Sequence, residues 1–180
     1  MSYFEKTTAT TIKENPIIMG IETSCDETAV AIIKNGREIL ADEIISSATE
    51  HAKFGGVVPE IASRTHTTAI LEATRRALEK AGLGLNDIDA FAVTKGAGLL
   101  GALLVGVSFA KALAYSMGKP LVPVSHIRGH VAASYLADKD LQPPFISWSC
   151  SILSASRFSI SLLMSIFIAI SRFCVWLRSF

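Results

Sequence analysis

Cysteine is scarce in this sequence, and its first residues contain no long apolar run. The three cysteines, Cys25, Cys150 and Cys174, have no paired spacing, which argues against a disulfide framework and a CxxC metal site. Residues 1–16 mix acidic, basic and threonine side chains and have none of the apolar character of a secretory leader. We therefore expect a reducing, cytoplasmic setting for the protein.

An excess of charge of one sign is also absent. The formal net charge is +1 at pH 7, so the overall charge by itself predicts neither a nucleic acid nor a membrane surface as partner. The balance nevertheless changes along the chain. Residues 1–146 carry 14 Lys and Arg against 16 Asp and Glu, whereas residues 147–180 carry three arginines and no acidic residue.

Residues 147–180 lack Gly, Pro, Asp, Asn and Thr, so serine is their one common turn or cap residue. Three interpretations stay open. A membrane anchor would need about 20 apolar residues, but Arg157 and Arg172 enclose only 14 residues. A buried helix would show a sustained 3.6-residue period, which this segment does not have. The third interpretation is an out-of-frame or otherwise aberrant terminus.

The preceding part of the chain alternates apolar runs with turn signals. Asn35-Gly36 predicts a two-residue hairpin turn between two strands, and Gly82 and Gly118 are placed to end helices. Three early strands followed by alternating helices and strands predict an α/β fold with a mixed five-stranded sheet. The expected strands are 16–22, 29–33, 38–46, 87–93 and 121–124, and the expected helices are 59–81, 99–117 and 126–136.

Two histidines four residues apart, His126 and His130, follow the apolar run 120–124. Residues at i and i+4 share one helix face, so both imidazoles can bind one metal ion, and imidazole suits zinc and iron. The alternative is one buried and one surface histidine. A zinc protease would have a glutamate directly after the first histidine, and this position is Ile127, so the base for protease chemistry is missing.

Two polar loops could bind phosphate. The first, residues 22–28, follows an apolar strand and offers hydroxyls and backbone N–H groups for a phosphate. The carboxylates of Glu22, Asp26 and Glu27 would hold Mg²⁺ or orient a nucleophile. An ordinary hairpin with solvated acids is the alternative. The second is the glycine-rich stretch 96–101, where a helix begins. It is not a dinucleotide fingerprint, because residues 102–137 contain no acid. Close helix packing is the alternative.

Four stretches together resemble one family, the universal tRNA threonylcarbamoyl-adenosine synthases of the actin/hexokinase superfamily, formerly called O-sialoglycoproteases. The stretches are Met19-Gly20-Ile21-Glu22-Thr23-Ser24-Cys25-Asp26-Glu27-Thr28, Gly55 to His66, Thr94 to Gly106, and the pair His126 and His130. The resemblance covers residues 17–146 in the family's order and spacing. Residues 1–16 would be an N-terminal extension, and residues 147–180 a non-homologous hydrophobic tail.

The resemblance implies an actin-like (RNase H-like) domain, the first of two in the family. It implies transfer of the threonylcarbamoyl group from threonylcarbamoyl-adenylate to N6 of the adenosine next to the anticodon of tRNA. Glu22 would be catalytic, His126 and His130 would bind one metal ion, Fe(II) rather than Zn(II), and Ser24, Asp26, Gly96 and Gly98 would bind the substrate nucleotide. Partner subunits would include a paralogous actin-like subunit and a small ATPase, with no membrane involved.

The sequence departs from the family pattern in two places. Ala97 stands where the family usually has proline, and after residue 147 neither the Ser-Gly-Gly-His substrate loop nor the metal-binding aspartate of the second domain follows. A change of reading frame near codon 147 would explain the second departure, and we then expect the chain to be inactive. The alternative function is a non-catalytic scaffold or partner subunit of the same superfamily. Kinase or ATPase activity rests on fold analogy alone.

Overall fold

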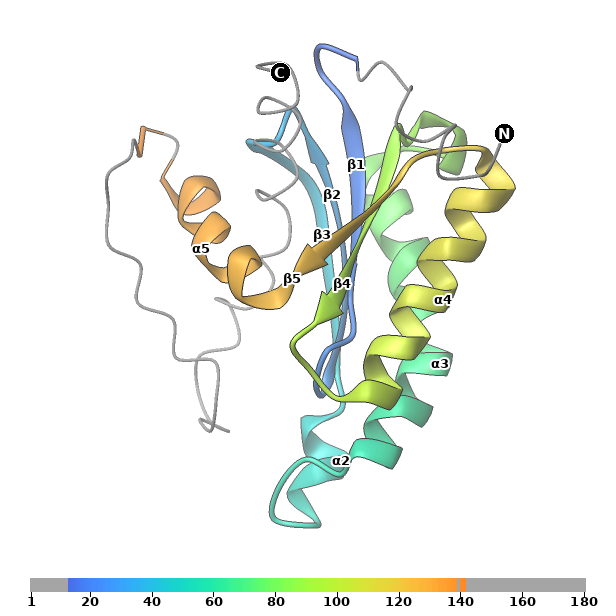
Figure 1. The fold of residues 1–180 in the computed structure, drawn as a ribbon, viewed down its shortest axis with the longest axis vertical. Helices are drawn as coiled ribbons and strands as arrows, with labels where there is room; N and C mark the ends of the chain where they lie inside the picture. The colour runs from blue at the N-terminus through green and yellow to red at the C-terminus, as the bar shows by residue number, and fades with distance from the viewer. Residues whose placement is uncertain (1–12, 139, 142–180) are drawn as a thin grey trace.

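In the computed structural model, which describes residues 13–138 and 140–141, five strands form one mixed sheet in the order β3-β2-β1-β4-β5. The strands β1, β2 and β3 pair antiparallel, whereas β4 and β5 extend the sheet parallel to β1. Figure 1 shows α3 and α4 on one face of this sheet and α5 on the other. The predicted mixed α/β sheet is confirmed. The expected boundaries at residues 1–16 and 147–180 lie largely outside the described residues.

The observed elements follow the expected order. The strands are β1 Ile17–Glu22, β2 Glu27–Lys34, β3 Glu38–Ser46, β4 Ala90–Gly96 and β5 Leu121–Ser125. The helices are α2 Ala48–Ala52, α3 Pro59–Ala81, α4 Leu100–Met117 and α5 His126–Ala137, and Leu85–Asp87 forms a short 3-10 helix. The fourth strand therefore begins three residues later than expected, and the five-residue helix α2 had no counterpart in the sequence prediction.

The hairpin between β2 and β3 turns at the predicted residues. Asn35 has a φ of 52° and Gly36 a φ of 65°, and the Arg37 N–H donates to the Lys34 carbonyl at 3.3 Å. Positive φ at both central positions is typical of the turn that matches the twist of paired strands, and Asn and Gly adopt it at little cost. Pairing resumes between Lys34 and Glu38, so the loop contains three residues instead of two.

Both ends of α3 lie where the sequence predicts them. Pro59 occupies the first turn, where its missing N–H costs no hydrogen bond, and Gly82 ends the helix with a φ of 65°. The buried face includes Ala62, Ile70 and Ala77. Leu71, by contrast, is 68% exposed. It follows Ile70 directly, and a step of 100° along the helix turns it away from the sheet.

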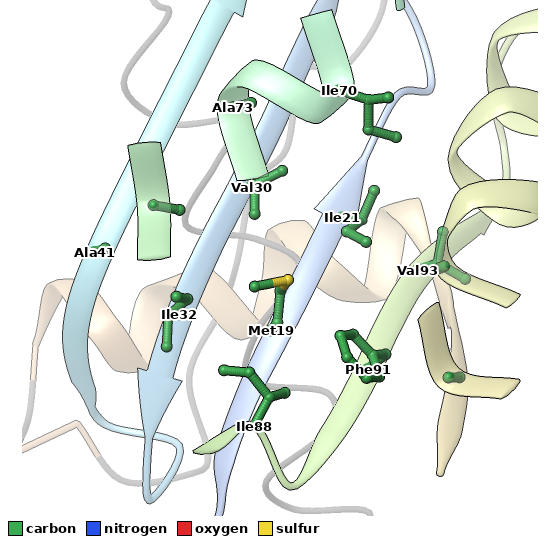
Figure 2. Packing of buried hydrophobic residues seen from close by; sticks show 13 residues of the cluster. Met19, Ile21, Val30, Ile32, Ala41, Ile70, Ala73, Ile88, Phe91 and Val93 are labelled. Carbon is green, nitrogen blue, oxygen red and sulfur yellow. The ribbon is translucent and has the colours of Figure 1, made fainter. Parts of the chain in front are cut away.

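The main core lies between the sheet and the helices α3 and α4. Figure 2 shows Met19 and Ile21 of β1, Val30 of β2, and Phe91 and Val93 of β4 pointing into this layer. All five are at most 2% exposed. Full burial of one large apolar side chain contributes about 1.5–3 kcal/mol. This layer therefore anchors the strands whose ends carry the candidate site.

Helix α4 ends at Gly118, whose φ is 61°, as expected. By length and composition it could cross a membrane, and it is the one such helix in the described part of the chain. Core helices of soluble proteins pass the same test, and α4 packs with Ala102, Ala110 and Ala114 fully buried in the layer between helices and sheet. Leu100, Leu104 and Tyr115 of the same helix are exposed, so burial in the core accounts for only part of its hydropathy.

The candidate site lies on the face of the sheet that is covered by α5, opposite the main core. Side chains of a strand alternate between faces, and since Met19 and Ile21 point toward α3 and α4, Glu22 points to the face of α5. On that face Ala31 and Ile33 pack against Ala132, Tyr135 and Leu136 of α5. The parallel strands β1, β4 and β5 all end at one edge, where Glu22 and the start of α5 come together.

Candidate functional site

Two imidazole rings meet at the start of α5. His126 follows β5 directly, and one turn later His130 places its Nε2 3.0 Å from the Nε2 of His126. The ring centroids are 4.5 Å apart and the ring planes are inclined by 81°. The structure thus brings together the two predicted metal ligands, and it does so through the nitrogen of each ring that lies farthest from its backbone.

The spacing of the two nitrogens fits a shared metal ion. Metal–nitrogen bonds of about 2.0–2.1 Å place two ligand nitrogens roughly 2.9 Å apart at a right angle and roughly 3.4 Å apart at a tetrahedral angle. The observed 3.0 Å lies within this range. Within residues 13–138 and 140–141, no three His, Cys, Asp or Glu side chains are grouped to hold a metal ion. The described residues therefore offer two candidate metal ligands, both imidazoles.

The electrostatic surroundings favour neutral imidazole at His130. Its burial lowers its pKa below the ordinary 6.5, and the neighbouring His126 ring lowers it further, whereas Glu22 acts in the opposite direction. A neutral imidazole keeps the nitrogen lone pair that a metal ion needs. His130 is therefore suited to bind a cation at neutral pH.

Glu22 and Ser24 lie on the other side of the His126 ring. The Ser24 Oγ is 3.2 Å from His126 Nδ1, and the nearer Glu22 carboxylate oxygen is 3.8 Å from the same nitrogen. Glu22 is 2% exposed, and its Oε1 accepts a hydrogen bond from the Ser24 N–H at 2.8 Å. The predicted catalytic acid therefore lies behind the first histidine, on the side away from His130.

Asp26 occupies a different part of the same loop. Its backbone carbonyl accepts hydrogen bonds from the Ser47 N–H at 3.0 Å and the Ser47 hydroxyl at 2.6 Å, which join the loop to the end of β3. Glu22, Asp26 and Glu27 do not form a group of three metal ligands in the described structure, and their expected part in Mg²⁺ binding stays a prediction.

Cys25, between Ser24 and Asp26, has the properties of an unreactive thiol. Burial and, secondarily, the negative charge of Asp26 raise its pKa to about 12. Since the thiolate is the nucleophilic form of cysteine, this side chain is not suited to covalent catalysis.

A buried histidine of α3, His66, connects this loop to the helix. His66, 1% exposed, has its Nδ1 2.7 Å from the Thr28 hydroxyl and its Nε2 3.0 Å from the Cys25 carbonyl. The carbonyl can only accept, so Nε2 carries the proton and Nδ1 accepts from the Thr28 hydroxyl. Burial lowers the pKa of His66 accordingly. Its only signal in the sequence was its place in the second stretch of the family resemblance.

The glycine-rich loop lies directly against the Ser24 loop. A Cβ at Gly98 would lie 2.6 Å from both the Cβ and the carbonyl oxygen of Ser24, and the Leu99 N–H donates to that carbonyl at 2.7 Å. Gly106 likewise leaves room for the side chain of Thr23, whose hydroxyl donates to the Ala102 carbonyl at 2.8 Å. Close packing thus accounts for Gly98, and its expected part in nucleotide binding stays a prediction.

Gly96 differs from Gly98. It ends β4 opposite Ser125, and a Cβ there would meet no heavy atom within 4 Å in the part of the chain that the structure describes. Its neighbour Thr94 is 1% exposed, and the Thr94 Oγ1 has no hydrogen-bond partner among the described residues. The pairing of β1 with β4 ends at Ile21 opposite Val93, and Glu22 and Thr94 each follow that last pair. The only signal for Thr94 in the sequence was its place at the start of the third stretch of the family resemblance.

Comparison with known proteins identifies the family to which this chain belongs. The profile of the tRNA N6-adenosine threonylcarbamoyltransferase family matches residues 38–164. The chain belongs to this family. A family member from Clostridium perfringens is 55% identical over 144 residues, which cover 80% of this chain and 42% of the relative. One from Clostridioides difficile is 57% identical over 131 residues, which cover 73% of this chain and 39% of the relative. The chain spans about 40% of the length of these relatives.

Solved structures support the same fold. The chain is similar to YeaZ from Pseudomonas aeruginosa, with a TM-score of 0.51 and 20% sequence identity, over 69% of this chain and 50% of that one. A second Pseudomonas aeruginosa structure, described as similar to peptidase YEAZ, gives a TM-score of 0.50 at 22% identity. This likeness concerns the fold, and together with the sheet order it confirms the predicted actin-like α/β architecture of the threonylcarbamoyltransferase family member.

Proposed function

We propose that this chain supplies the metal-binding part of an enzyme that transfers a threonylcarbamoyl group to N6 of the adenosine next to the anticodon of tRNA. The observation that carries the proposal is the approach of the His126 and His130 Nε2 atoms to 3.0 Å, beside the buried Glu22, in a member of this family. Transfer to tRNA would take place in the cytoplasm.

The proposed reaction is an acyl transfer. The N6 amine of adenosine attacks the carbonyl carbon of threonylcarbamoyl-adenylate and forms a C–N bond. The bond between that carbon and the phosphate oxygen breaks, AMP leaves with the electron pair, and the amine loses a proton. Negative charge grows on the carbonyl and phosphate oxygens, so the site needs fixed positive charge and hydrogen-bond donors.

The residues of this chain would divide these tasks. His126 and His130 would hold one divalent metal ion, Fe(II) rather than Zn(II), which when bound would polarise an oxygen of the acyl donor. The loops containing Ser24 and Asp26, and Gly96 and Gly98, flank the sheet edge where the adenylate would lie. Glu22 would position the site or accept a proton. The open surroundings of Gly96 support its assignment to the nucleotide.

A chimera tests this proposal directly. Residues 17–146 of this chain replace the matching segment of the Clostridium perfringens relative, and the modified nucleoside is measured in tRNA by mass spectrometry. We expect the chimera to make the product, and His126→Ala or His130→Ala to lower the rate by about 100-fold or more, as for loss of a preorganised electrostatic group. Ser116→Ala, at the exposed far end of α4, is the matched control.

A folded chimera without activity, or full activity after either histidine substitution, would contradict the proposal. For the 180-residue chain by itself we expect no transfer, because its described residues provide two metal ligands and no third. Product formed by this chain alone would refute that expectation.

A non-catalytic, subunit-binding role is the second candidate, and one surface favours it. Leu100, Leu104 and Tyr115 are 76%, 55% and 77% exposed on α4, and such apolar clusters commonly mark interaction sites. The proposed partners are a paralogous actin-like subunit and a small ATPase. Co-purification of the chain with the paralogous subunit, lost in Leu104→Asp, would support this role. It becomes the main role if His126→Ala leaves the chimera fully active.

A further inference from the structure

The two nitrogens of the His126 ring have different neighbours. Nε2 faces His130 at 3.0 Å, whereas Nδ1 faces the Ser24 hydroxyl at 3.2 Å and a Glu22 carboxylate oxygen at 3.8 Å. The ring therefore lies between a possible metal position on one side and an acidic, hydroxyl-bearing loop on the other. Which nitrogen carries the proton decides whether the ring can bind a metal through Nε2.

The neighbours on the Nδ1 side favour a proton there. An ionised carboxylate only accepts hydrogen bonds, so the negative charge of Glu22 favours the tautomer with Nδ1–H over a bare Nδ1 lone pair. The Ser24 oxygen can accept that proton. The Nε2 lone pair of His126 then faces the Nε2 of His130 at 3.0 Å.

Ser24 itself has little freedom to move. Its N–H donates to Glu22 at 2.8 Å, its carbonyl accepts from the Leu99 N–H at 2.7 Å, and its Cβ borders Gly98. It is only 2% exposed. The hydroxyl is thus held in place by β1 and by the start of α4, 102 residues away in sequence from the ring that it contacts.

We propose that Ser24, supported by Glu22, is a positioning residue that holds His126 as the Nδ1–H tautomer, so that its Nε2 and that of His130 can bind one divalent metal ion. This rests on the proposed function only in assigning a metal to the histidine pair. Partners behind metal-binding histidines commonly change metal affinity by about 10–100-fold, because they set the tautomer and orientation of the ring.

Zinc binding to the purified 180-residue chain tests the proposal, with affinity measured by competition against a chromogenic chelator. We expect Ser24→Ala and Glu22→Gln each to weaken Zn²⁺ binding by about 10–100-fold. The control Ser116→Ala removes an exposed serine hydroxyl that donates to the Leu113 carbonyl, on α4 and away from the histidine pair, and should leave the affinity unchanged. Thermal unfolding of each variant checks that it is folded.

A second measurement does not depend on the metal. Two-dimensional ¹⁵N NMR of the histidine rings, at one fixed alkaline pH without metal, reports which nitrogen of His126 is protonated. A proton on Nδ1 that loses its preference in Ser24→Ala supports the proposal. A proton on Nε2, or a folded Ser24→Ala chain that binds Zn²⁺ like the wild type, overturns it.

The two measurements also separate this inference from the proposed function. A wild-type chain that binds no Zn²⁺ contradicts the assignment of a metal to the histidine pair. It then also contradicts the proposal that the Nδ1–H tautomer of His126 serves metal binding. If Ser24→Ala weakens Zn²⁺ binding while the chimera makes no modified tRNA, the positioning role is supported and the transferase proposal fails.

Discussion

Replacing Gly98 by alanine should lower the free energy of unfolding more than any other single methyl addition in the glycine-rich loop. The new Cβ would lie 2.6 Å from the Cβ and the carbonyl oxygen of Ser24, so the added methyl meets backbone and cannot be accommodated by a rotamer change alone. Overpacking of this kind costs about 1–3 kcal/mol. Gly98 also has a φ of 157°, which side-chain-bearing residues rarely adopt and which adds about 1–3 kcal/mol.

The free energy of unfolding should therefore fall by about 2–6 kcal/mol in Gly98→Ala, which is a large part of the 5–15 kcal/mol of a typical domain. Urea titration followed by circular dichroism measures this loss as a lower midpoint with an unchanged slope.

Gly96→Ala is the matched control, because a Cβ there would meet nothing within 4 Å in the described structure. It should change the free energy of unfolding by no more than about 0.5 kcal/mol, as for substitutions away from special contacts. Equal midpoints for the two variants would show that the loop does not press against Ser24, and the packing argument would be wrong.

Four further substitutions test the core and the buried polar groups. Thr94→Val, which replaces an unpartnered buried hydroxyl by a methyl group, should raise the unfolding midpoint, whereas a fall would reveal a partner for that hydroxyl. Phe91→Ala should cost about 3–5 kcal/mol, while Leu71→Ala, at an exposed position, should cost little; similar losses in a urea titration would contradict the burial pattern. Since burial lowers the pKa of His66 below 6.5 in the folded chain, the unfolded chain binds more protons there, so stability is full above pH 6.5 and falls as the pH drops further. His66→Gln should flatten this pH dependence, and an unchanged slope would remove His66 as its cause.

Local signals explain which elements could be predicted from the sequence. Pro59 and Gly82 mark both ends of α3, and the observed helix has the predicted bounds because each of these residues has a strong backbone preference. The start of β4 was predicted three residues too early, because residues 85–87 instead form a 3-10 turn. Helix α2, with five residues, is too short to show a 3.6-residue period.

Some features of the candidate site could likewise be predicted from the sequence, and others could not. The His126 and His130 pair could be predicted because four residues along one helix place two side chains on one face. The contact between Ser24 and His126 could not, since it joins residues 102 positions apart and depends on β1 and β5 ending at the same edge of the sheet. The same holds for Gly98, whose local sequence is equally typical of a phosphate loop and of close packing.

Ser24 connects the packing of this fold with the geometry of the histidine pair. Its backbone carbonyl and Cβ border the loop before α4, its N–H is bound by Glu22, and its hydroxyl reaches His126. A shift of Ser24 forced by a methyl group at Gly98 must therefore move the hydroxyl relative to the ring as well. We expect Gly98→Ala to weaken Zn²⁺ binding in the fraction that stays folded, and Gly96→Ala to leave it unchanged. Loss of stability without loss of Zn²⁺ affinity would mean that the ring is oriented by α5 alone, and that Ser24 follows the histidine instead of holding it.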